Sequence, residues 1–354
     1  MDVAGYRIDK VDPTEMPEAE QEAIARLWQV MGKELLPEEP ARPMPAILAR
    51  LRSKPANQWS ASFRARDTKG NVVGFGGGGK SLNEPENAHL IWSELQVHPD
   101  HRRKGLGTAL LREFVRACEG QHPSIVFMGM ANDRVPAAEP FLRGIGATPG
   151  LPMKTNQLDL PAVDRTQIAE WAKLDPAGYR LEWIDNVVPD RLMRAYLDSS
   201  NGMNDAPKGD LKMADWKLTA EQVRDGENWR AQVGIEWWLI VAVHEATGRG
   251  AGFTDVAYDP KQPWVIQQRG TAVIDPHRGH HLGLWMKAAM LDRILRERPE
   301  ATVIRTGNAN TNAQMLGINT QLGFKVAWQS TLWQLPMADA RKSLDRAEAT
   351  PASR

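Results

Sequence analysis

The most informative stretch of the chain is residues 94–108, which read ELQVHPDHRRKGLGT. The apolar pattern before it predicts a strand over Leu90–Val97, and the apolar face after it predicts a helix over Thr108–Glu119. Between them lies a tight basic loop with two glycines, Gly105 and Gly107, which permit dihedral angles and close approaches that side chains would block. This order of strand, loop and helix indicates a binding loop at the start of a helix.

The loop has the chemistry of an anion cradle. A helix N-terminus supplies unpaired N–H groups and the positive end of the helix dipole. Arg102, Arg103 and Lys104 add positive charge of the kind that surrounds a pyrophosphate. A P-loop needs Gly-x-x-x-x-Gly-Lys-Ser/Thr, and the order here is different. A dinucleotide fingerprint needs a third glycine, which is absent.

The chain contains an internal duplication. Residues 4–8 (AGYRI) recur as residues 177–181 (AGYRL), an offset of 173. The loop Arg102–Gly107 recurs as Arg278–Gly283, an offset of 176. Further pairs follow in the same order at nearly the same offset, namely the hairpins 60–76 and 238–256, Asn132 with Asn308, and Gly146-Ala147 with Gly323-Phe324. Such a run of matched landmarks indicates two similar halves.

The duplication sets the expected domain boundaries. We expect a first domain over residues 1–160, a linker over 161–177, a second domain over 178–336 and a polar, disordered tail over 337–354. Within the linker, Asp164–Leu174 reads as a short helix with an aspartate cap, and Asp175-Pro176 ends it.

Composition excludes several other classes of protein. The length of 354 residues suits two domains, and Lys plus Arg equal Asp plus Glu at 44 each, so we expect neither nucleic acid nor a lipid surface as a partner. The N-terminus has no signal-peptide pattern, and the longest apolar run, within Ile235–Val243, is too short to span a bilayer. A single cysteine, Cys118, lies at core spacing in the predicted helix. We expect a reduced, cytoplasmic protein.

The motif Arg-x-x-Gly-x-Gly, preceded by Val-x-Pro, resembles the coenzyme A signature of the GCN5-related N-acetyltransferase (GNAT) superfamily. The resemblance covers residues 6–160 and 179–335, and it implies an α/β fold of two tandem GNAT-like domains, each a splayed mixed β-sheet flanked by helices. It also implies acetyl-CoA as cosubstrate.

The same resemblance assigns cofactor-binding residues. It implies that the pantetheine arm pairs with the backbone of Leu95, Gln96 and Val97. It places the pyrophosphate over the loop and the helix start, that is, over Arg103, Lys104, Gly105, Leu106, Gly107 and Thr108. Arg102 occupies the motif's Gln/Arg position, and Asn132 matches an asparagine often found near the pantetheine or the sulfur.

The second half departs from the motif. His281 stands where the first glycine is wanted, and Leu284 follows in place of Ser or Thr. Conversely, Asn308–Phe324 resembles the family's closing segment better than Ala131–Ala147 does. Bulk at a phosphate-cradling glycine is obstructive, so we expect the coenzyme site in the first half and a degenerate, structural second domain that shapes the substrate cleft.

Glu94 is the best-placed carboxylate to act as a general base toward an amine, directly or through water. The alternative is a solvated or salt-bridged strand residue. His98 and His101 are further candidate bases, although their place in the turn favours a role in lining or capping the loop. The family's acid, a tyrosine, is replaced by Leu142 and Asn319, which leaves Asn132 or a water.

Two other groups of polar residues give weaker evidence of a functional site. His277, His280 and His281 lack the accompanying carboxylates of a metal site, so we expect no metal there. The resemblance puts the polar connection Asn201–Lys217 over the acceptor cleft. Its Asp205 and Asp210 could hold an ammonium group, or could serve as turn and cap residues.

The sequence therefore predicts an enzyme that transfers acetyl from acetyl-CoA to a primary amine of a small molecule. A protein lysine or N-terminal amine is the alternative acceptor, and a non-catalytic sensor or scaffold that binds coenzyme A is an alternative of another class. The sequence makes no prediction of oligomeric state.

Overall fold

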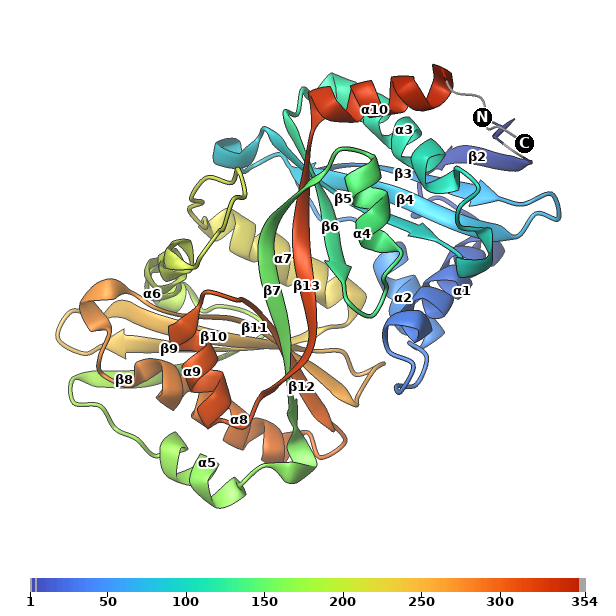
Figure 1. Cartoon of the computed structure of the whole chain (residues 1–354). Helices are drawn as coiled ribbons and strands as arrows, with labels where there is room; N and C mark the ends of the chain where they lie inside the picture. Colours follow the sequence, from blue (N-terminus) through green and yellow to red (C-terminus); the bar gives the residue numbers. More distant parts are fainter. Residues whose placement is uncertain (1, 4, 350–354) are drawn as a thin grey trace. The chain divides into compact units, whose positions relative to one another are not determined.

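The computed structural model describes residues 2–3 and 5–349 (Figure 1). The chain divides into two compact units, each built from separate stretches of sequence. Unit 1 contains residues 1–152, 208–214 and 330–354, and unit 2 contains residues 153–207 and 215–329.

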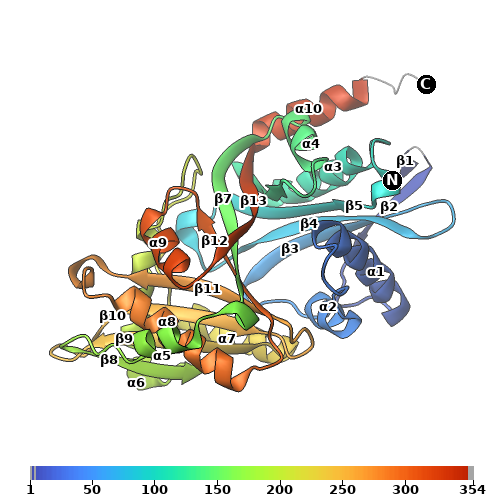
Figure 2. The same cartoon turned by 60° about the horizontal axis from the view of Figure 1, so that its bottom comes forward.

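Unit 1 is a mixed sheet with helices on both faces. Its strands follow the order β1 (Asp2–Val3), β2 (Tyr6–Val11), β3 (Gln58–Arg66), β4 (Val72–Ser81), β5 (Leu90–Val97), β6 (Ile125–Asn132) and the last part of β13 (Lys325–Pro336). Helices α1 (Glu18–Leu35) and α2 (Met44–Leu51) lie on one face and α3 (Leu106–Cys118) on the other (Figure 2). The remaining helices are α4 (Ala138–Gly144), α10 (Met337–Ala349) and the 3-10 turns η1 (Pro85–Asn87), η2 (Pro99–His101) and η3 (Glu119–Gln121).

Unit 2 repeats this plan. Its strands follow the order β7 (Thr148–Asp159, from residue 153), β12 (Val303–Ala309), β11 (Val265–Val273), β10 (Arg249–Tyr258), β9 (Glu236–His244) and β8 (Tyr179–Asp185). Its helices are α5 (Arg165–Ala172), α6 (Asp190–Ser200), α7 (Ala220–Val233), α8 (Leu282–Glu297) and α9 (Ala313–Gln321), with 3-10 turns η4 (Leu160–Ala162), η5 (Asn201–Asp205) and η6 (Asp275–His277). The predicted fold class is confirmed.

Each sheet opens in its middle. In unit 1, β5 pairs with β4 as far as Val97, but its parallel pairing with β6 ends at Trp92 opposite Phe127. Gly129, two residues further along β6, has a φ of +66°, which other residues rarely adopt, so it turns β6 away from β5. In unit 2, the pairing of β11 with β12 likewise ends after Gln267 opposite Arg305. The far half of β5 therefore keeps an edge that β6 does not cover.

The duplication is visible in matching side-chain contacts. Tyr6 Oη lies 3.1 Å from His101 Nδ1, and Tyr179 Oη lies 2.8 Å from His277 Nδ1. Strand register agrees as well. Asn132 of β6 faces Ser330, and Asn308 of β12 faces Lys154, so that 308 − 132 and 330 − 154 both equal 176. The two halves are copies of one structural plan.

The closing strand and helix of each half belong to the other half's unit, which differs from the predicted domain boundaries. Strand β7 pairs with β12 in unit 2 and leads into α5, which packs on α8. Strand β13 pairs with β6 in unit 1 and leads into α10, which packs on α3. An alternating strand shows which side chains are buried but not which neighbour it pairs with, so this exchange cannot be predicted from the local pattern.

Two local predictions fall on these closing segments. The capped helix is confirmed, because Asp164 accepts hydrogen bonds from the backbone N–H groups of Thr166 and Gln167. The disordered tail is wrong for residues 337–344, where Met337, Ala340 and Leu344 are buried in the core of unit 1. Residues 350–354 of the predicted tail lie outside the described residues.

Cys118 is fully buried in the core between α3 and the unit 1 sheet. Burial raises the pKa of its thiol to about 12, so the side chain stays protonated and serves as core, as predicted. None of the helices among the described residues is both long and apolar enough to cross a membrane.

Candidate functional site

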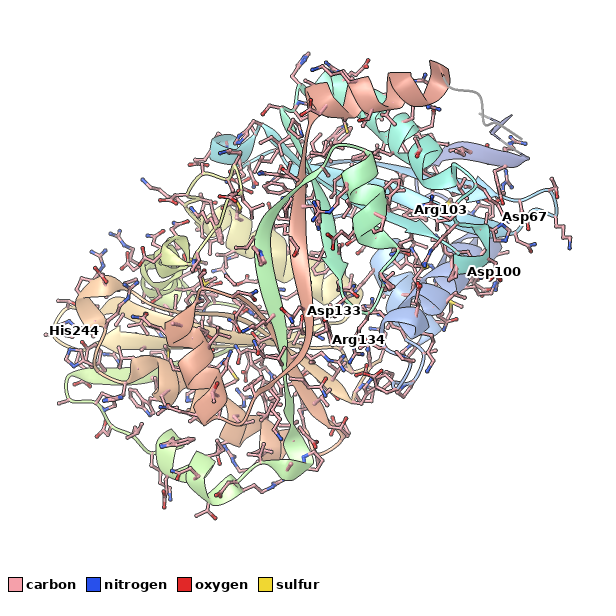
Figure 3. The ribbon with its side chains drawn as sticks, viewed as in Figure 1. Asp67, Asp100, Arg103, Asp133, Arg134 and His244 are labelled. Carbon is pink, nitrogen blue, oxygen red and sulfur yellow. The ribbon has the colours of Figure 1, made fainter. Side chains whose placement is uncertain are left out.

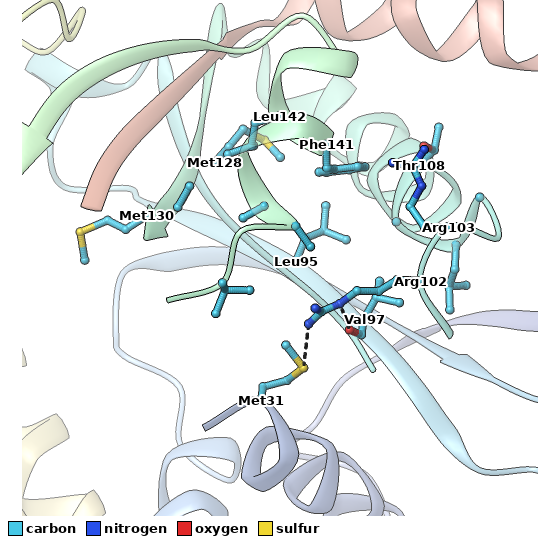
Figure 4. Close-up of a pocket in the computed structure, with 17 residues that line it drawn as sticks. Met31, Leu95, Val97, Arg102, Arg103, Thr108, Met128, Met130, Phe141 and Leu142 are labelled. Carbon is cyan, nitrogen blue, oxygen red and sulfur yellow. Dashed lines mark hydrogen bonds between the residues drawn. The ribbon is translucent and has the colours of Figure 1, made fainter. Parts of the chain in front are cut away.

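A cavity of about 410 Å³ lies in unit 1, where β5 and β6 separate (Figure 4). Most of the predicted loop lines it, namely Leu95, Val97, Arg102, Arg103, Gly105, Leu106, Gly107 and Thr108. The cavity thus extends from the start of α3 to the uncovered edge of β5. Its position and its lining match a site for an extended ligand with an anionic end.

Helix α3 begins with unpaired N–H groups. Its N-cap, Gly105, has a φ of +76° and offers no capping side chain. The first backbone N–H to bond back to the cap is that of Ala109, which donates to the Gly105 carbonyl at 3.0 Å. The N–H groups of residues 106–108 are therefore available at the positive end of the helix dipole, which suits a phosphate.

The three basic residues of the loop have different surroundings. The Arg102 guanidinium donates to both carboxylate oxygens of Glu34 in α1, at 2.6 and 2.5 Å. Its Nε donates to the Val97 carbonyl at 3.1 Å, and Nη2 lies 4.0 Å from Met31 Sδ (Figure 4). Arg102 therefore lines the cavity with its charge already paired, and its main contribution is to tie the loop to β5 and α1.

Arg103 is the cation that remains for a ligand. It is exposed, lines the cavity at the start of α3 (Figure 4), and makes no hydrogen bond or ion pair with any residue that the structure describes. Lys104, by contrast, donates from Nζ to the Asp100 carbonyl at 3.0 Å and does not line the cavity. Arg103 therefore offers its charge to a ligand, whereas Lys104 closes the turn.

Glu94 and Gln96 lie on the other face of β5. Because side chains alternate along a strand, Leu95 and Val97 face the cavity while Glu94 and Gln96 point away from it. Glu94 is exposed and opposite Gly77, and it forms no ion pair within the described part of the chain. The Oε1 atom of Gln96 is buried without a hydrogen-bond partner. Of the alternatives for Glu94, the salt-bridged one is absent here, and the solvated and catalytic ones remain.

The Glu94 face carries an aromatic pair and a covering segment. Trp92 is 45% exposed, and its ring packs edge-on against Phe127 with centroids 4.7 Å apart. Residues 208–214, part of the predicted connection over the acceptor cleft, belong to unit 1, where Leu211 and Met213 pack in a cluster with Phe127. The N–H of Asp210 donates to the Gly150 carbonyl at 2.8 Å. This face is a partly covered apolar surface beside a free carboxylate.

Asn132 does not line the cavity. Its Oδ1 accepts hydrogen bonds from the backbone N–H groups of Arg134 and Val135, both at 3.0 Å, in the turn that carries Asp133 and Arg134 (Figure 3). The side chain therefore shapes the turn after β6. The histidines of the loop are similarly occupied, since His98 Nδ1 accepts from the Asp100 N–H and His101 bonds to Tyr6.

Several cavity residues were not predicted. They are apolar and come from α1, β6, α4 and the turn before α4, namely Met31, Met128, Met130, Ala131, Val135, Ala137, Ala138, Phe141 and Leu142. Leu142, at the position of the family's tyrosine, is buried in this wall. The apolar pattern of α4 could have indicated its residues, whereas nothing local to Met31 connects it with a loop seventy residues away.

The loop before α8 has the same backbone shape with other side chains. Gly279 and His281 have φ angles of +82° and +58°, and Arg103 and Gly105 have +63° and +76° at the matching positions, 176 residues earlier. Arg278 repeats the bond to the strand end, from Nε to the Val273 carbonyl at 3.1 Å. His281 therefore keeps the path of the loop and places an imidazole where unit 1 has no side chain.

The second copy of the tyrosine position also lies in a core. Asn319 is buried and donates from Nδ2 to Asn308 Oδ1 at 2.8 Å, and Asn156 donates to the same oxygen at 3.1 Å. Among the described residues, no group of three or more His, Cys, Asp or Glu side chains is arranged to hold a metal ion.

Residues 24–146, which contain the loop and the cavity, match the model of the acetyltransferase (GNAT) family. No curated protein matches the sequence. Among solved structures, the chain is similar to a tandem GNAT protein from the clavulanic acid biosynthesis pathway, with 24% identity, a TM-score of 0.75 and coverage of 94% of this chain and 98% of that one.

Two other solved structures share the fold at lower identity. One is a GCN5-related N-acetyltransferase from Sphaerobacter thermophilus, with 15% identity, a TM-score of 0.65 and coverage of 94% and 96%. The other is a GCN5-related glucosamine N-acetyltransferase region in a fungal multi-domain β-N-acetylglucosaminidase, with 14% identity, a TM-score of 0.64 and coverage of 93% of this chain and 38% of that one.

With the two-fold repeat, the splayed sheets and the loop, these findings define a tandem two-domain fold like that of the tandem GNAT protein. Residues 24–146 thus match the GNAT family, and the whole chain shares the fold of a tandem GNAT protein. Acetyltransferases of this family use acetyl-CoA. The residues of unit 1 fit that molecule, because unpaired N–H groups and Arg103 lie at one end of the cavity and an uncovered strand edge lies at the other.

Proposed function

We propose that unit 1 binds acetyl-CoA and transfers its acetyl group to a primary amine of a small molecule. The observation that carries this proposal is the cavity itself, which joins the anion-binding start of α3 to the gap between β5 and β6. A phosphate-binding end and a strand-pairing edge are the two features that a nucleotide with a pantetheine arm requires.

Each part of the cofactor would meet a different part of the cavity. The pyrophosphate would accept hydrogen bonds from the N–H groups of residues 106–108 and pair with Arg103. The pantetheine arm would bond to the free backbone edge of Leu95–Val97, against the apolar wall of β6 and α4. Arg102, held by Glu34, keeps the loop in place during these contacts.

The chemistry requires a neutral amine, a polarised thioester carbonyl and a site for the leaving thiolate. Glu94 would accept the ammonium proton from the opposite face of β5, directly or through water. A backbone N–H near Val97 would donate to the carbonyl oxygen. Leu142 cannot donate a proton, so the thiolate would take its proton from water.

A small acceptor is favoured by the covering segment over the Glu94 face. Leu211 and Met213 of this segment pack in a cluster with Phe127, whose ring also contacts Trp92 on the Glu94 face, and a partly covered surface admits a small molecule more readily than a folded protein surface. Incubation with peptide and protein amines, beside a panel of small amines, tests this choice. Acetylation of the peptides alone would contradict it.

Titration calorimetry with coenzyme A and acetyl-CoA tests the cofactor site. We expect one site per chain, with affinity reduced at least about tenfold in Arg103→Ala. Lys104→Ala is the matched control, because its Nζ bonds to Asp100 and it does not line the cavity, so its affinity should change little. Two equivalent sites, or equal losses in both variants, would contradict the proposed geometry.

Leu142 favours one other function, a sensor that binds coenzyme A without turnover, since this wall residue offers no acid. Tight binding of acetyl-CoA with no acetyl transfer across a broad amine panel would support the sensor. Transfer to any amine, lost in Glu94→Gln, would support the enzyme.

A further inference from the structure

Unit 2 contains a buried carboxylate at an irregularity of its sheet. The register between β10 and β11 shifts between Thr254 and Val256, so that Arg269 and Gly270 of β11 form a bulge opposite Asp255. Its Oδ1 accepts from the Gly270 N–H and its Oδ2 from Trp237 Nε1, both at 2.7 Å. Bulges re-aim side chains and are common beside binding sites. Asp255 is thus fixed by β9 and β11 close to where β11 separates from β12.

Asp255 in turn holds an arginine. Nε of Arg269 lies 3.3 Å from Asp255 Oδ2, and the Arg269 side chain is 52% exposed. The contact uses the inner nitrogen of the guanidinium, and the described residues provide no acceptor for its two Nη groups. Burial raises the pKa of the Asp255 carboxyl, so its charged form depends on this arginine and on the two N–H donors.

A second guanidinium lies over the same tryptophan. The centre of the Arg230 guanidinium is 4.1 Å from the centroid of the Trp237 ring. The carboxylate of its helix neighbour Glu227 is already taken, by the Val188 N–H and by Arg224, each at 2.8 Å. Trp237 therefore links the two arginines, Arg230 through its face and Arg269 through Asp255.

Arg230 lacks acceptors in a way that other arginines with a buried Nε do not. Six arginines in the described part of the chain have a buried Nε without a partner, namely Arg42, Arg50, Arg64, Arg112, Arg230 and Arg298. The other five bond or pair through other atoms, whereas Arg230 makes no hydrogen bond or ion pair with a described residue. Burial, and next the charge of Arg269, lower the pKa of Arg230.

A guanidinium kept charged in such surroundings is costly unless an anion meets it. Unit 2 offers a matched comparison. Arg293 lies 4.1 Å over the ring of Trp238, the same stacking distance, but its nitrogens donate to Asp185 at 2.7 and 2.9 Å and to Glu297 at 3.1 Å. One stacked arginine has its acceptors within the unit, and the other does not.

We propose that Arg230 and Arg269 bind a small oxyanion, a carboxylate or a phosphate group of a ligand, beside Trp237 in unit 2. The planar fork of a guanidinium fits either group. Asp255 positions Arg269 through its Nε and leaves both Nη groups to the ligand. This site is separate from the proposed acetyl-CoA cavity and does not depend on it.

Arginine Nε–Hε resonances of the full-length, ¹⁵N-labelled protein test the proposal directly. Arg230→Lys and Arg293→Lys identify the two signals, and sodium acetate or inorganic phosphate is then titrated against sodium chloride at matched ionic strength. We expect a saturable shift of the Arg230 signal with no shift of the Arg293 signal. Arg269→Ala should weaken the apparent affinity at least about tenfold, with the near-UV circular dichroism unchanged.

The outcomes separate clearly. A shift with acetate alone assigns a carboxylate ligand, one with phosphate alone assigns a phosphate ligand, and either supports the site. No saturable shift with either anion, or parallel shifts of the Arg230 and Arg293 signals, would overturn it. If Arg269→Ala fails to fold, Arg230→Met replaces it. That variant should lose any anion-induced rise in melting temperature without being less stable in the absence of anion.

Discussion

The loops before α3 and α8 show what a duplicated domain keeps and what it changes. Both follow the same left-handed turns at matching positions, and both are tied to the preceding strand by an arginine Nε that donates to a carbonyl at 3.1 Å. They differ in the side chains that a ligand would meet. Unit 1 presents a bare Gly105 beside a free Arg103, and unit 2 presents His281 beside Gly279. Backbone shape is therefore a property of the fold, and ligand binding depends on what is added to it.

The largest effect should come from placing a charge on the bare position. A Cβ at Gly105 would meet no atom within 4 Å, and aspartate tolerates left-handed angles, so Gly105→Asp should fold. Its carboxylate would face the pyrophosphate, and we expect coenzyme A affinity to fall by roughly a hundredfold or more. Calorimetry measures the loss.

Gly105→Asn has the same size without the charge and should lose about tenfold or less. Equal losses in Asp and Asn variants would mean that bulk rather than charge excludes the ligand. In that case Gly105→His, which copies the unit 2 loop, should be as damaging. Gly107→Asp is a poorer choice, because a Cβ there would lie 3.2 Å from the Phe141 ring and disturb packing.

Glu94→Gln should separate binding from chemistry within unit 1. Glutamine keeps the volume and hydrogen bonding of Glu94 but removes its basicity, so we expect turnover to fall by about a hundredfold with acetyl-CoA affinity preserved. The matching residue in unit 2 is Gly270, since 270 − 94 equals 176. The rate–pH profile should also lose its acidic limb. Turnover within a few-fold of wild type would return Glu94 to a solvated strand residue.

Local signals in the sequence were enough to indicate a loop that lines a cavity, because Gly105, Gly107 and the basic residues lie within a few positions of one another. They were not enough for partners distant in sequence. The sequence predicts that Arg102 is a ligand-binding cation, but in the structure its guanidinium pairs with Glu34, which is 68 residues away in the sequence. The exchange of β7 and β13 is invisible for the same reason, since pairing depends on the whole sheet.

The buried lysine of α8 marks a second difference between the units. Lys287 occupies the position of Leu111 in α3, since 287 − 111 equals 176, and burial lowers its pKa to about 7. The unfolded chain binds a proton on this amine up to about pH 10, and the folded chain releases it near pH 7. Stability should therefore rise with pH between about 7 and 10, where the unfolded state binds more protons.

Lys287→Leu copies unit 1 and should remove that pH dependence. We expect it to raise the free energy of unfolding near pH 7 by at least about 1 kcal/mol, with a smaller gain near pH 10. Denaturant unfolding at both pH values measures the difference. A variant that is less stable than wild type at pH 7 would show that the amine has a partner whose loss outweighs the gain.

The smallest effects should come from the arginines that the two loops share. Arg102 pairs with Glu34 while their side chains are 20% and 24% exposed, whereas the partners of Arg278, Asp205 and Asp275, are 52% and 81% exposed. Water screens the second set more strongly, so Arg102→Ala should cost about 1–2 kcal/mol of unfolding free energy and Arg278→Ala less than about 1 kcal/mol. Raising the salt concentration should shrink the effect of Arg278→Ala further.

Only Arg102→Ala should also weaken coenzyme A binding, by roughly tenfold, because it releases the loop that presents the N–H groups of residues 106–108. Glu34→Gln is the control, since it removes the ion pair and leaves the Nε bond to Val97 in place. If the Glu34→Gln variant binds coenzyme A with wild-type affinity, the bond from Arg102 Nε to the Val97 carbonyl is sufficient to hold the loop. The loop before α8, which has the matching bond from Arg278 Nε to Val273, should then be equally rigid.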